Sequence, residues 1–264
     1  MNKMNNRDNC MNSFNILKTL FCGSLLALSV VSTAQAGVSL DRTRIVLTGN
    51  ENSASVNLKN TSPDIPFLAQ SWVENENGQK ISSPLVALPP LQRLDGDQKG
   101  VVRITKTAEI GLLPQDRESL FYLNVREIPP APKQANVLQM AMQSRIKLFY
   151  RPAAITPEKP GMVWQDQLIF KKQGNKFIAE NPTPYYITII GLSNKLNGED
   201  SDKLTTFPGL MVAPKSSLDI PVKTTNVNQF YMMYVNDYGG HPELKFVCQQ
   251  DSCKVAPKEQ QPKY

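Results

Sequence analysis

The sequence is poor in the residue types on which most catalytic and metal sites depend. It has a single histidine, His241, and four cysteines among 264 residues. Histidine and cysteine are frequent ligands of tightly bound transition metals, and histidine is the most frequent general acid or base. The chain also has no Gly-x-Ser-x-Gly element to present a nucleophilic serine. We therefore expect no enzymatic activity, no metal and no cofactor.

Charge of one sign is not concentrated anywhere in the chain. There are 29 Lys and Arg against 23 Asp and Glu, which gives a formal net charge of +6. Basic runs interleaved with aromatic residues, which are typical of nucleic-acid binding, do not occur. This composition predicts no nucleic-acid partner, but a mildly basic protein can still bind a partner that bears a carboxylate.

Long hydrophobic runs are scarce as well. The clearest one spans residues 20–31, follows three basic residues, and precedes the small residues of Ala34-Gln35-Ala36. The run is too short to cross a bilayer, and the pattern is typical of a cleavable secretory signal. We expect removal of residues 1–36 and an exported protein that begins at Gly37. An uncleaved membrane anchor is the alternative.

Two of the four cysteines lie outside this signal segment. Cys248 and Cys253 are separated by four residues near the end of the chain. In an oxidising compartment such a pair favours a local disulfide that closes a small hairpin. A metal site is the alternative, but it would need more ligands than His241 can supply.

The rest of the pattern is β. Short runs rich in Val, Ile, Leu, Phe and Tyr alternate with Pro, Gly, Asn and Asp. Strand number and spacing favour two successive immunoglobulin-like sandwiches. The strands expected in the first half are Val38–Leu47, Ala54–Lys59, Phe67–Val73, Pro84–Leu88, Val101–Thr105, Leu120–Arg126 and Asn136–Tyr150. Those in the second half are Val163–Phe170, Lys176–Ala179, Tyr185–Leu192, Gly209–Val212, Ser217–Ile220, Phe230–Val235 and Leu244–Val247.

Three prolines and a glycine between residues 152 and 161 interrupt the β pattern, because proline cannot donate to a strand ladder. We therefore predict a first domain over residues 37–152, a hinge over 153–160, a second domain over 161–257 and a polar tail over 258–264.

The expected strand Asn136–Tyr150 is unusually long. Leu138, Met140 and Met142 alternate with polar or small residues. Such a row is typical of a core-facing strand, but methionine also suits surfaces that accept varied partners. Lys147 has the opposite parity to the row, so we expect a bulge or strong twist between Met142 and Lys147.

Six ordered blocks of sequence extend from Gly37 to Gly240, behind the predicted signal. They are GVSLDRTRIV (37–46), LAQSWVENEN (68–77), PQDRESLFY (114–122), REIPP (126–130), IKLFYRP (146–152) and NDYGG (236–240). Together these blocks resemble the PapD-type periplasmic pilus chaperones.

This resemblance implies an all-β fold of two immunoglobulin-like domains set at an angle, with a cleft between them. It implies a periplasmic chaperone that stabilises and caps pilus subunits and delivers them to an outer-membrane usher. Such subunits lack one strand, and the chaperone lends its own. The lent row is then Leu138, Met140 and Met142. No nucleotide is needed, and weak self-association through the exposed strand is expected.

The resemblance also implies roles for charged residues. Arg44 and Lys147 correspond to the cations that anchor the C-terminal carboxylate of the subunit. Glu118, Arg151 and Asp237 correspond to an interdomain salt-bridge network.

Two further features follow from the family pattern. A cis proline is expected at Pro89-Pro90, and the short connection from Arg126 to Asn136 places the chain in the short-loop class. The competing hypothesis is an exported two-domain β-sandwich that serves as a structural or adhesive pilus component.

Overall fold

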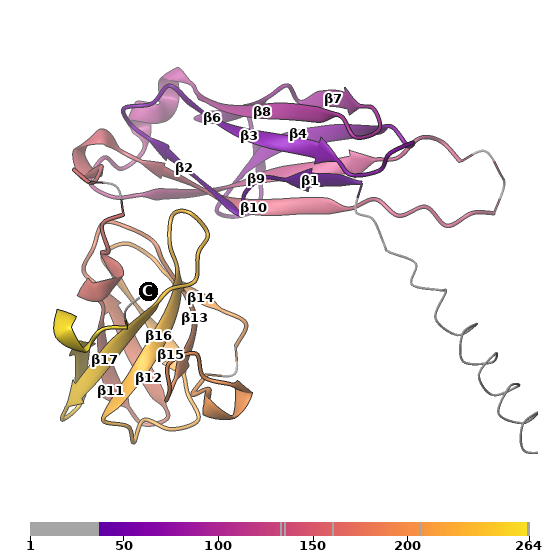
Figure 1. Cartoon of the computed structure of the whole chain (residues 1–264). Helices are drawn as coiled ribbons and strands as arrows, with labels where there is room; N and C mark the ends of the chain where they lie inside the picture. The colour runs from indigo at the N-terminus through magenta and orange to yellow at the C-terminus, as the bar shows by residue number, and fades with distance from the viewer. Residues whose placement is uncertain (1–36, 133, 135, 160, 206, 263–264) are drawn as a thin grey trace, which may run out of the picture. The chain divides into compact units, whose positions relative to one another are not determined.

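The computed structural model describes residues 37–132, 134, 136–159, 161–205 and 207–262. The predicted signal segment, residues 1–36, lies outside the described residues. Within the described part, no helix combines the length and the apolar character needed to cross a membrane. The regular elements there are eighteen strands and five short 3-10 turns (Figure 1).

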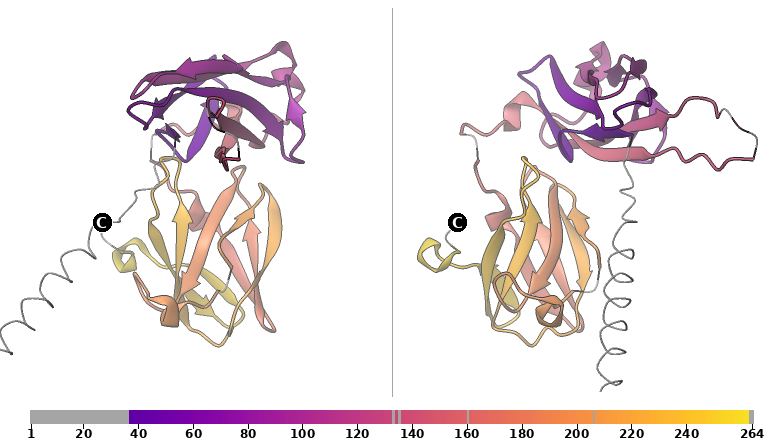
Figure 2. Two further views of the ribbon diagram at one scale, coloured as in Figure 1. Left: turned by 90° about the vertical axis from the view of Figure 1, so that its right-hand side faces the viewer. Right: turned by 45° about the vertical axis from the view of Figure 1, so that its right-hand side comes forward.

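The first ten strands form two layers around one hydrophobic core (Figures 1 and 2). One sheet has the order β1-β3-β8-β6, and the other has the order β2-β10-β9-β4-β5, with β7 also paired to β4. Alternate residues of these strands point inward, such as Val56 and Leu58 of β3, which are almost fully buried. The strands are β1 (Val38–Leu40), β2 (Arg44–Thr48), β3 (Ser53–Asn60), β4 (Phe67–Asn75), β5 (Lys80–Ile81), β6 (Leu85–Leu88), β7 (Leu91–Leu94), β8 (Lys99–Lys106), β9 (Ser119–Ile128) and β10 (Gln143–Arg151).

The last eight strands form one continuous ladder with the order β14-β13-β16-β17-β18-β11-β12-β15. The strands at its two ends follow each other in sequence, so the sheet must curl around its core. Phe170, Phe177, Phe230 and Phe246 fill that core with ring centroids 5.0–6.1 Å apart. The strands are β11 (Ile169–Gln173), β12 (Lys176–Asn181), β13 (Ile187–Ser193), β14 (Leu210–Val212), β15 (Ser216–Pro221), β16 (Gln229–Val235), β17 (Glu243–Gln249) and β18 (Ser252–Val255).

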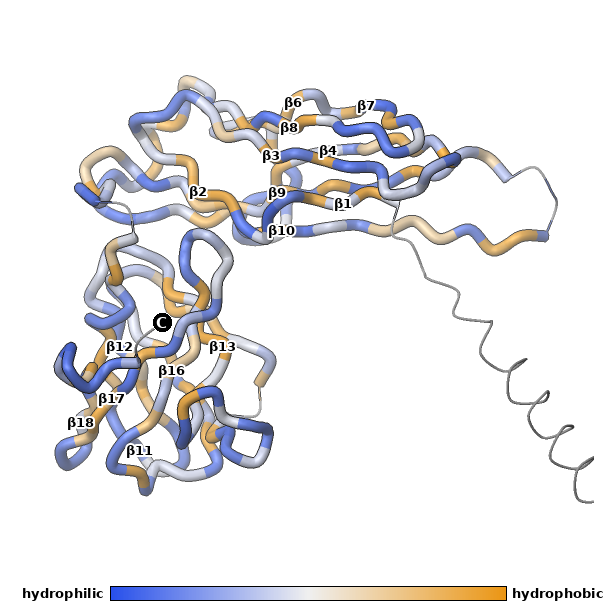
Figure 3. Tube along the Cα trace, in the orientation of Figure 1, coloured by the Kyte–Doolittle hydropathy of each residue, from blue (hydrophilic) through white to orange (hydrophobic). Residues whose placement is uncertain are grey.

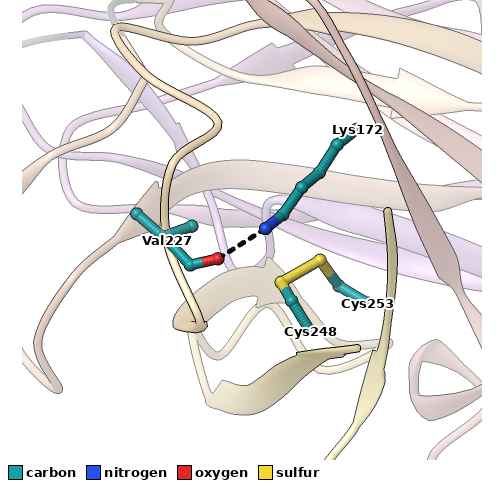
Figure 4. Close-up of a disulfide and its surroundings, with 4 residues drawn as sticks. All are labelled: Lys172, Val227, Cys248 and Cys253. Atoms are coloured by element: carbon teal, nitrogen blue, oxygen red, sulfur yellow. Dashed lines mark hydrogen bonds between the residues drawn. A yellow bond between two sulfur atoms is a disulfide. The ribbon is translucent and has the colours of Figure 1, made fainter. Parts of the chain in front are cut away.

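The predicted disulfide between Cys248 and Cys253 is present, with an S–S distance of 2.04 Å. It joins directly paired residues of the β17–β18 hairpin. The Cys253 side chain is completely buried in the second core. Beside it, Lys172 Nζ donates a hydrogen bond of 2.8 Å to the carbonyl oxygen of Val227 (Figure 4). The bridge thus clamps the last hairpin, as the sequence predicts.

Two expected strands are interrupted in the structure. The segment predicted as Val163–Phe170 contains a 3-10 turn at Gln165–Gln167, and the strand begins only at Ile169. Trp164 lies just before this turn, and its ring packs against that of Tyr185 with 4.4 Å between the centroids. The apolar residue that suggested a strand is therefore buried next to a turn. The predicted strand Val38–Leu47 is broken into β1 and β2, which pair in different sheets.

The long strand predicted from Asn136 is shorter in the structure. β10 begins at Gln143, and its pairing with β9 runs without a register shift to Tyr150. Of the two alternatives expected before Lys147, the bulge is therefore wrong for residues 143–147, and the strong twist stays a prediction. The connection between β9 and β10 instead extends beyond the neighbouring strands (Figure 1). At the predicted proline pair, the Leu88–Pro89 bond is cis.

Candidate functional site

Arg44 and Lys147 lie side by side. β2 and β10 are parallel neighbours, and their register pairs Arg44 with Lys147. Side chains at paired positions of adjacent strands point to the same face of the sheet. Two blocks of sequence about one hundred residues apart therefore present two cations at one place, which we call the anchor pair.

The anchor pair contacts uncharged oxygen atoms. Among the described residues, no Asp or Glu oxygen forms a salt bridge with Arg44 or Lys147. Arg44 Nη1 donates to the carbonyl oxygen of Val235 at 3.3 Å, and its buried Nε has no partner in the described part of the chain. Lys147 Nζ donates to Thr188 Oγ1 at 3.3 Å. Most of the donor capacity of both groups is therefore unused.

Burial lowers the pKa of both members of this pair. Burial lowers the pKa of Lys147 to about 8, and the charge of Arg44 adds to this effect. Burial also lowers the pKa of Arg44, while Asp237 and Glu118 act in the opposite direction. A bound anion would relieve both effects, because opposite charge favours the protonated forms.

Arg151, four residues further along β10, is in a different environment. Its guanidinium donates from Nε to Glu118 Oε1 at 2.8 Å and in bidentate fashion to Asp237, at 2.8 and 3.1 Å. Arg151 and Glu118 are each only 4% exposed. We call these three residues the Arg151 network. It joins the first β domain to Asp237, which follows β16.

Burial and hydrogen bonding shift the titration of this network. Burial raises the pKa of Glu118 to about 7, although Arg151 and the backbone N–H of Tyr186 both favour the charged form. Burial acts to lower the pKa of Arg151, but its hydrogen bond to Asp237 and the charge of Glu118 outweigh it and raise that pKa. Arg151 and Glu118 therefore form a buried, hydrogen-bonded pair, and Asp237, whose side chain is 30% exposed, holds the guanidinium from the more open side.

The predicted apolar row precedes β10. Leu138 is 91% exposed, Met140 69% and Met142 52%. Figure 3 shows hydrophobic residues along this connection, outside the sheet. Residues 138–142, which we call the lent segment, thus present large apolar side chains to solvent, where core residues would be buried.

Comparison with known proteins decides the family. Residues 37–156 match the model for the N-terminal domain of PapD, described as a pili and flagellar-assembly chaperone. Residues 163–246 match the C-terminal domain of the pili assembly chaperone PapD. The chain is a member of the PapD family of pilus assembly chaperones. The predicted all-β fold with two immunoglobulin-like domains is confirmed by these matches.

Individual proteins similar to this chain are also chaperones. The chain is 94% identical to chaperone protein PmfD of Proteus mirabilis (strain HI4320), over 96% of this chain and 100% of that protein. It is 50% identical to chaperone protein PapD of Escherichia coli, over 87% and 94%. Among solved structures, the periplasmic chaperone SfaE matches with 31% identity and a TM-score of 0.63, over 80% and 100%. The SafB chaperone, solved with the Salmonella enterica SafA pilin, matches with 25% identity and a TM-score of 0.68, over 82% and 99%.

The structure also shows contacts of residues that the sequence did not single out. Trp164 and Tyr185 hold the Arg151 guanidinium 4.8 and 5.0 Å from their ring centroids. Glu127 lies in the REIPP block, but nothing in the sequence signals its role, because its partners are backbone amides. The roles predicted for the anchor pair, the lent segment and the Arg151 network stay predictions.

Proposed function

We propose that this chain is a periplasmic chaperone that binds pilus subunits through the lent segment and the anchor pair and then delivers them to an outer-membrane usher. The observation that carries the proposal is a half-buried pair of cations that has no carboxylate partner in the described part of the chain. One of the two, Lys147, is on β10, the strand that follows the exposed apolar row, and Arg44 is beside it on β2. The similar SafB chaperone was solved in complex with a pilin, which supports a subunit as the partner here.

The anchor pair suits a C-terminal carboxylate. Arginine can direct two N–H groups onto one carboxylate, and lysine adds a compact charge. The site lies within a strand, so a subunit strand that ends there would continue along the same strand of the chaperone. The carboxylate would then fix the register of the added strand, and a slip of one residue would turn every side chain to the wrong face.

The spacing also sets the direction of the added strand. Met142 and Lys147 are five positions apart, which corresponds to about 17 Å of extended chain. If the carboxylate is at Lys147 and the preceding subunit residues reach the lent segment, the subunit strand runs parallel to β10. Subunit residues about five to nine positions before the C-terminus would then lie beside Met142, Met140 and Leu138.

Filling a groove in the subunit would supply the driving force. Each apolar side chain of the lent segment would contribute roughly 1.5–3 kcal/mol on full burial. Association and side-chain ordering cost several kcal/mol, so the net affinity is smaller than this sum. Main-chain hydrogen bonds add affinity without selecting particular subunits.

The mode of action needs no reaction. We propose that the protein is exported by the segment 1–36, that it is not an enzyme, and that it uses neither nucleotide nor cofactor. The exposed lent segment would also support weak self-association at high concentration. Nucleic acid has no part in this mechanism.

Substitution of Lys147 tests the proposal. Lys147→Ala and the control Lys99→Ala, an exposed lysine on β8, are each exported in cells that make the cognate pilus. We expect at least tenfold less subunit to co-purify with Lys147→Ala from the periplasm, while the control behaves like the native protein. Mass spectrometry identifies the bound chain. Equal subunit recovery with both variants would contradict the anchor and favour a structural or adhesive role.

A further inference from the structure

Glu127 is a buried carboxylate at the junction of three chain segments. It lies near the end of β9 and is only 4% exposed. Its Oε2 accepts the backbone N–H of Val38, at the start of β1, at 2.9 Å. Its Oε1 accepts the backbone N–H of Met142, the last residue of the lent segment, at 3.1 Å. One side chain therefore holds the beginning of the first domain and the root of the lent segment.

The same side chain ends the β9–β10 ladder. The backbone N–H of Glu127 donates to the carbonyl oxygen of Met142 at 3.0 Å, in register with the pairs that follow. The return hydrogen bond, from the N–H of Met142, goes to the carboxylate of Glu127. Regular pairing stops at this point, and the lent segment begins free of β9. Glu127 is thus a positioning residue for that segment.

The charge of Glu127 has no partner in the described part of the chain. No Lys or Arg nitrogen described there forms a salt bridge with it. The adjacent Arg126 is directed elsewhere, since its Nη2 donates to Gln70 at 2.6 Å and its guanidinium lies 5.7 Å from the centroid of Trp72. Buried charges in proteins are normally paired, because an unpaired one is costly. Two backbone N–H groups already stabilise this carboxylate, and a cation beside it would offset more of the cost of burying the charge.

If removal of residues 1–36 makes Gly37 the first residue, its α-ammonium group is a cation close to Glu127. A Cβ on Gly37 would lie 2.7 Å from Glu127 Oε2 and equally close to the ring of Phe67, so the Gly37 backbone packs directly against the carboxylate. Covalent geometry keeps the nitrogen of Gly37 within about 4 Å of the nitrogen of Val38. A free α-ammonium group at Gly37 would therefore lie within about 7 Å of the carboxylate, and rotation about the glycine can bring it closer.

We propose that Glu127 receives the α-ammonium group released when residues 1–36 are removed, and that this ion pair fixes Met142 at the root of the lent segment. Before cleavage, the nitrogen of Gly37 is an uncharged amide and Glu127 remains unpaired. Signal removal would then complete the site that holds the lent segment. The inference rests on the proposed export and deepens the proposed function, because it links maturation to readiness for subunit binding.

The experiment uses the exported, processed protein. Glu127→Gln keeps the side-chain shape and one acceptor oxygen, and Glu76→Gln, on an exposed turn, removes the same charge as a control. A third protein has two glycines inserted before Gly37. This insertion moves the ammonium group by up to about 7 Å and changes no buried side chain. Intact mass establishes the first residue of each protein.

Nuclear magnetic resonance reports the α-amino pKa and the exchange of single amides. We expect a native α-amino pKa about 1 above the usual ~7.7–8.0, unchanged in Glu76→Gln and back at the usual value in Glu127→Gln and in the insertion protein. In the last two, amide exchange at Val38 and Met142 should become at least tenfold faster, while exchange at Leu148 in mid-strand stays the same. A purely structural glutamate would not shift the α-amino pKa.

Three results would overturn the inference. They are an α-amino pKa that Glu127→Gln does not change, exchange at Met142 that the insertion does not change, and a processed chain that does not begin at Gly37. The proposed function is tested separately by subunit recovery. A native protein that shows the raised α-amino pKa but recovers no subunit would contradict the proposed function and leave the ion pair established.

Discussion

Two cations on one face of β10 have opposite environments, although only four residues separate them. Arg151 is buried and contacts two carboxylates at 2.7–3.1 Å. Lys147 is half-buried beside another cation, Arg44, and its ammonium group donates to the hydroxyl group of Thr188. This contrast leads us to expect that Arg151 serves the fold, because its removal would leave a buried carboxylate unpaired. We expect Lys147, whose charge is disfavoured by burial and by Arg44, to bind a negatively charged group of another molecule.

The strongest test of this contrast is Arg151→Ala. We expect the free energy of unfolding to fall by about 3–5 kcal/mol, because the change leaves Glu118 buried without its main donor. Urea denaturation followed by tryptophan fluorescence measures it, since Trp164 lies against Arg151. Arg93→Ala is the matched control, because its pair with Asp95 is exposed on both sides and contributes little. Equal stability of the two variants would refute the structural role of the network.

The sequence predicted the positions of these cations but not the conformation of the segment before them. The resemblance to a known family assigned Arg44 and Lys147 to one predicted site and Arg151 to another. Such an assignment can join residues of distant strands, which composition and spacing alone cannot do. Alternation within residues 138–142 predicted an apolar row, but it also predicted a strand there. The structure has none, because a strand needs a neighbour to hydrogen-bond with and the ladder with β9 ends at Met142.

Other features leave no pattern in the sequence. Glu127 acts on backbone amides, which nearly every residue possesses, so neither composition nor spacing could single it out. Trp164 lies in an apolar run that resembles a strand, and only its contact with Arg151 reveals its position. The paired or unpaired state of each cation likewise depends on three-dimensional contacts.

The second test concerns pH and subunit binding. The pKa of Lys147 is about 8 in the free chaperone, because of burial and of Arg44, and a bound carboxylate would raise it. Binding that needs the charged lysine is therefore complete below pH 8 and weakens as pH rises above it. We expect up to a tenfold loss of affinity for each pH unit above about 8, which corresponds to ~1.4 kcal/mol.

The dissociation constant of the purified subunit complex, measured from about pH 6 to 9.5, checks this expectation. Lys147→Arg serves as the control, because a guanidinium stays charged throughout that range. Its affinity should not change with pH. A native complex whose affinity is equally flat would show that the lysine charge is not used in binding.

The smallest expected effect is that of Lys147→Ala on stability. It tests whether Lys147, unlike Arg151, contributes little to the fold. The substitution removes a half-buried charge that Arg44 repels, and it breaks only one long hydrogen bond to Thr188. Loss of packing by the lysine stem offsets the relief of repulsion. We therefore expect the free energy of unfolding to change by less than about 1 kcal/mol. The urea measurement used for Arg151→Ala applies here unchanged. A loss as large as that of Arg151→Ala would mean that Lys147 is a structural residue, and reduced subunit recovery by this variant would then reflect misfolding rather than a missing anchor.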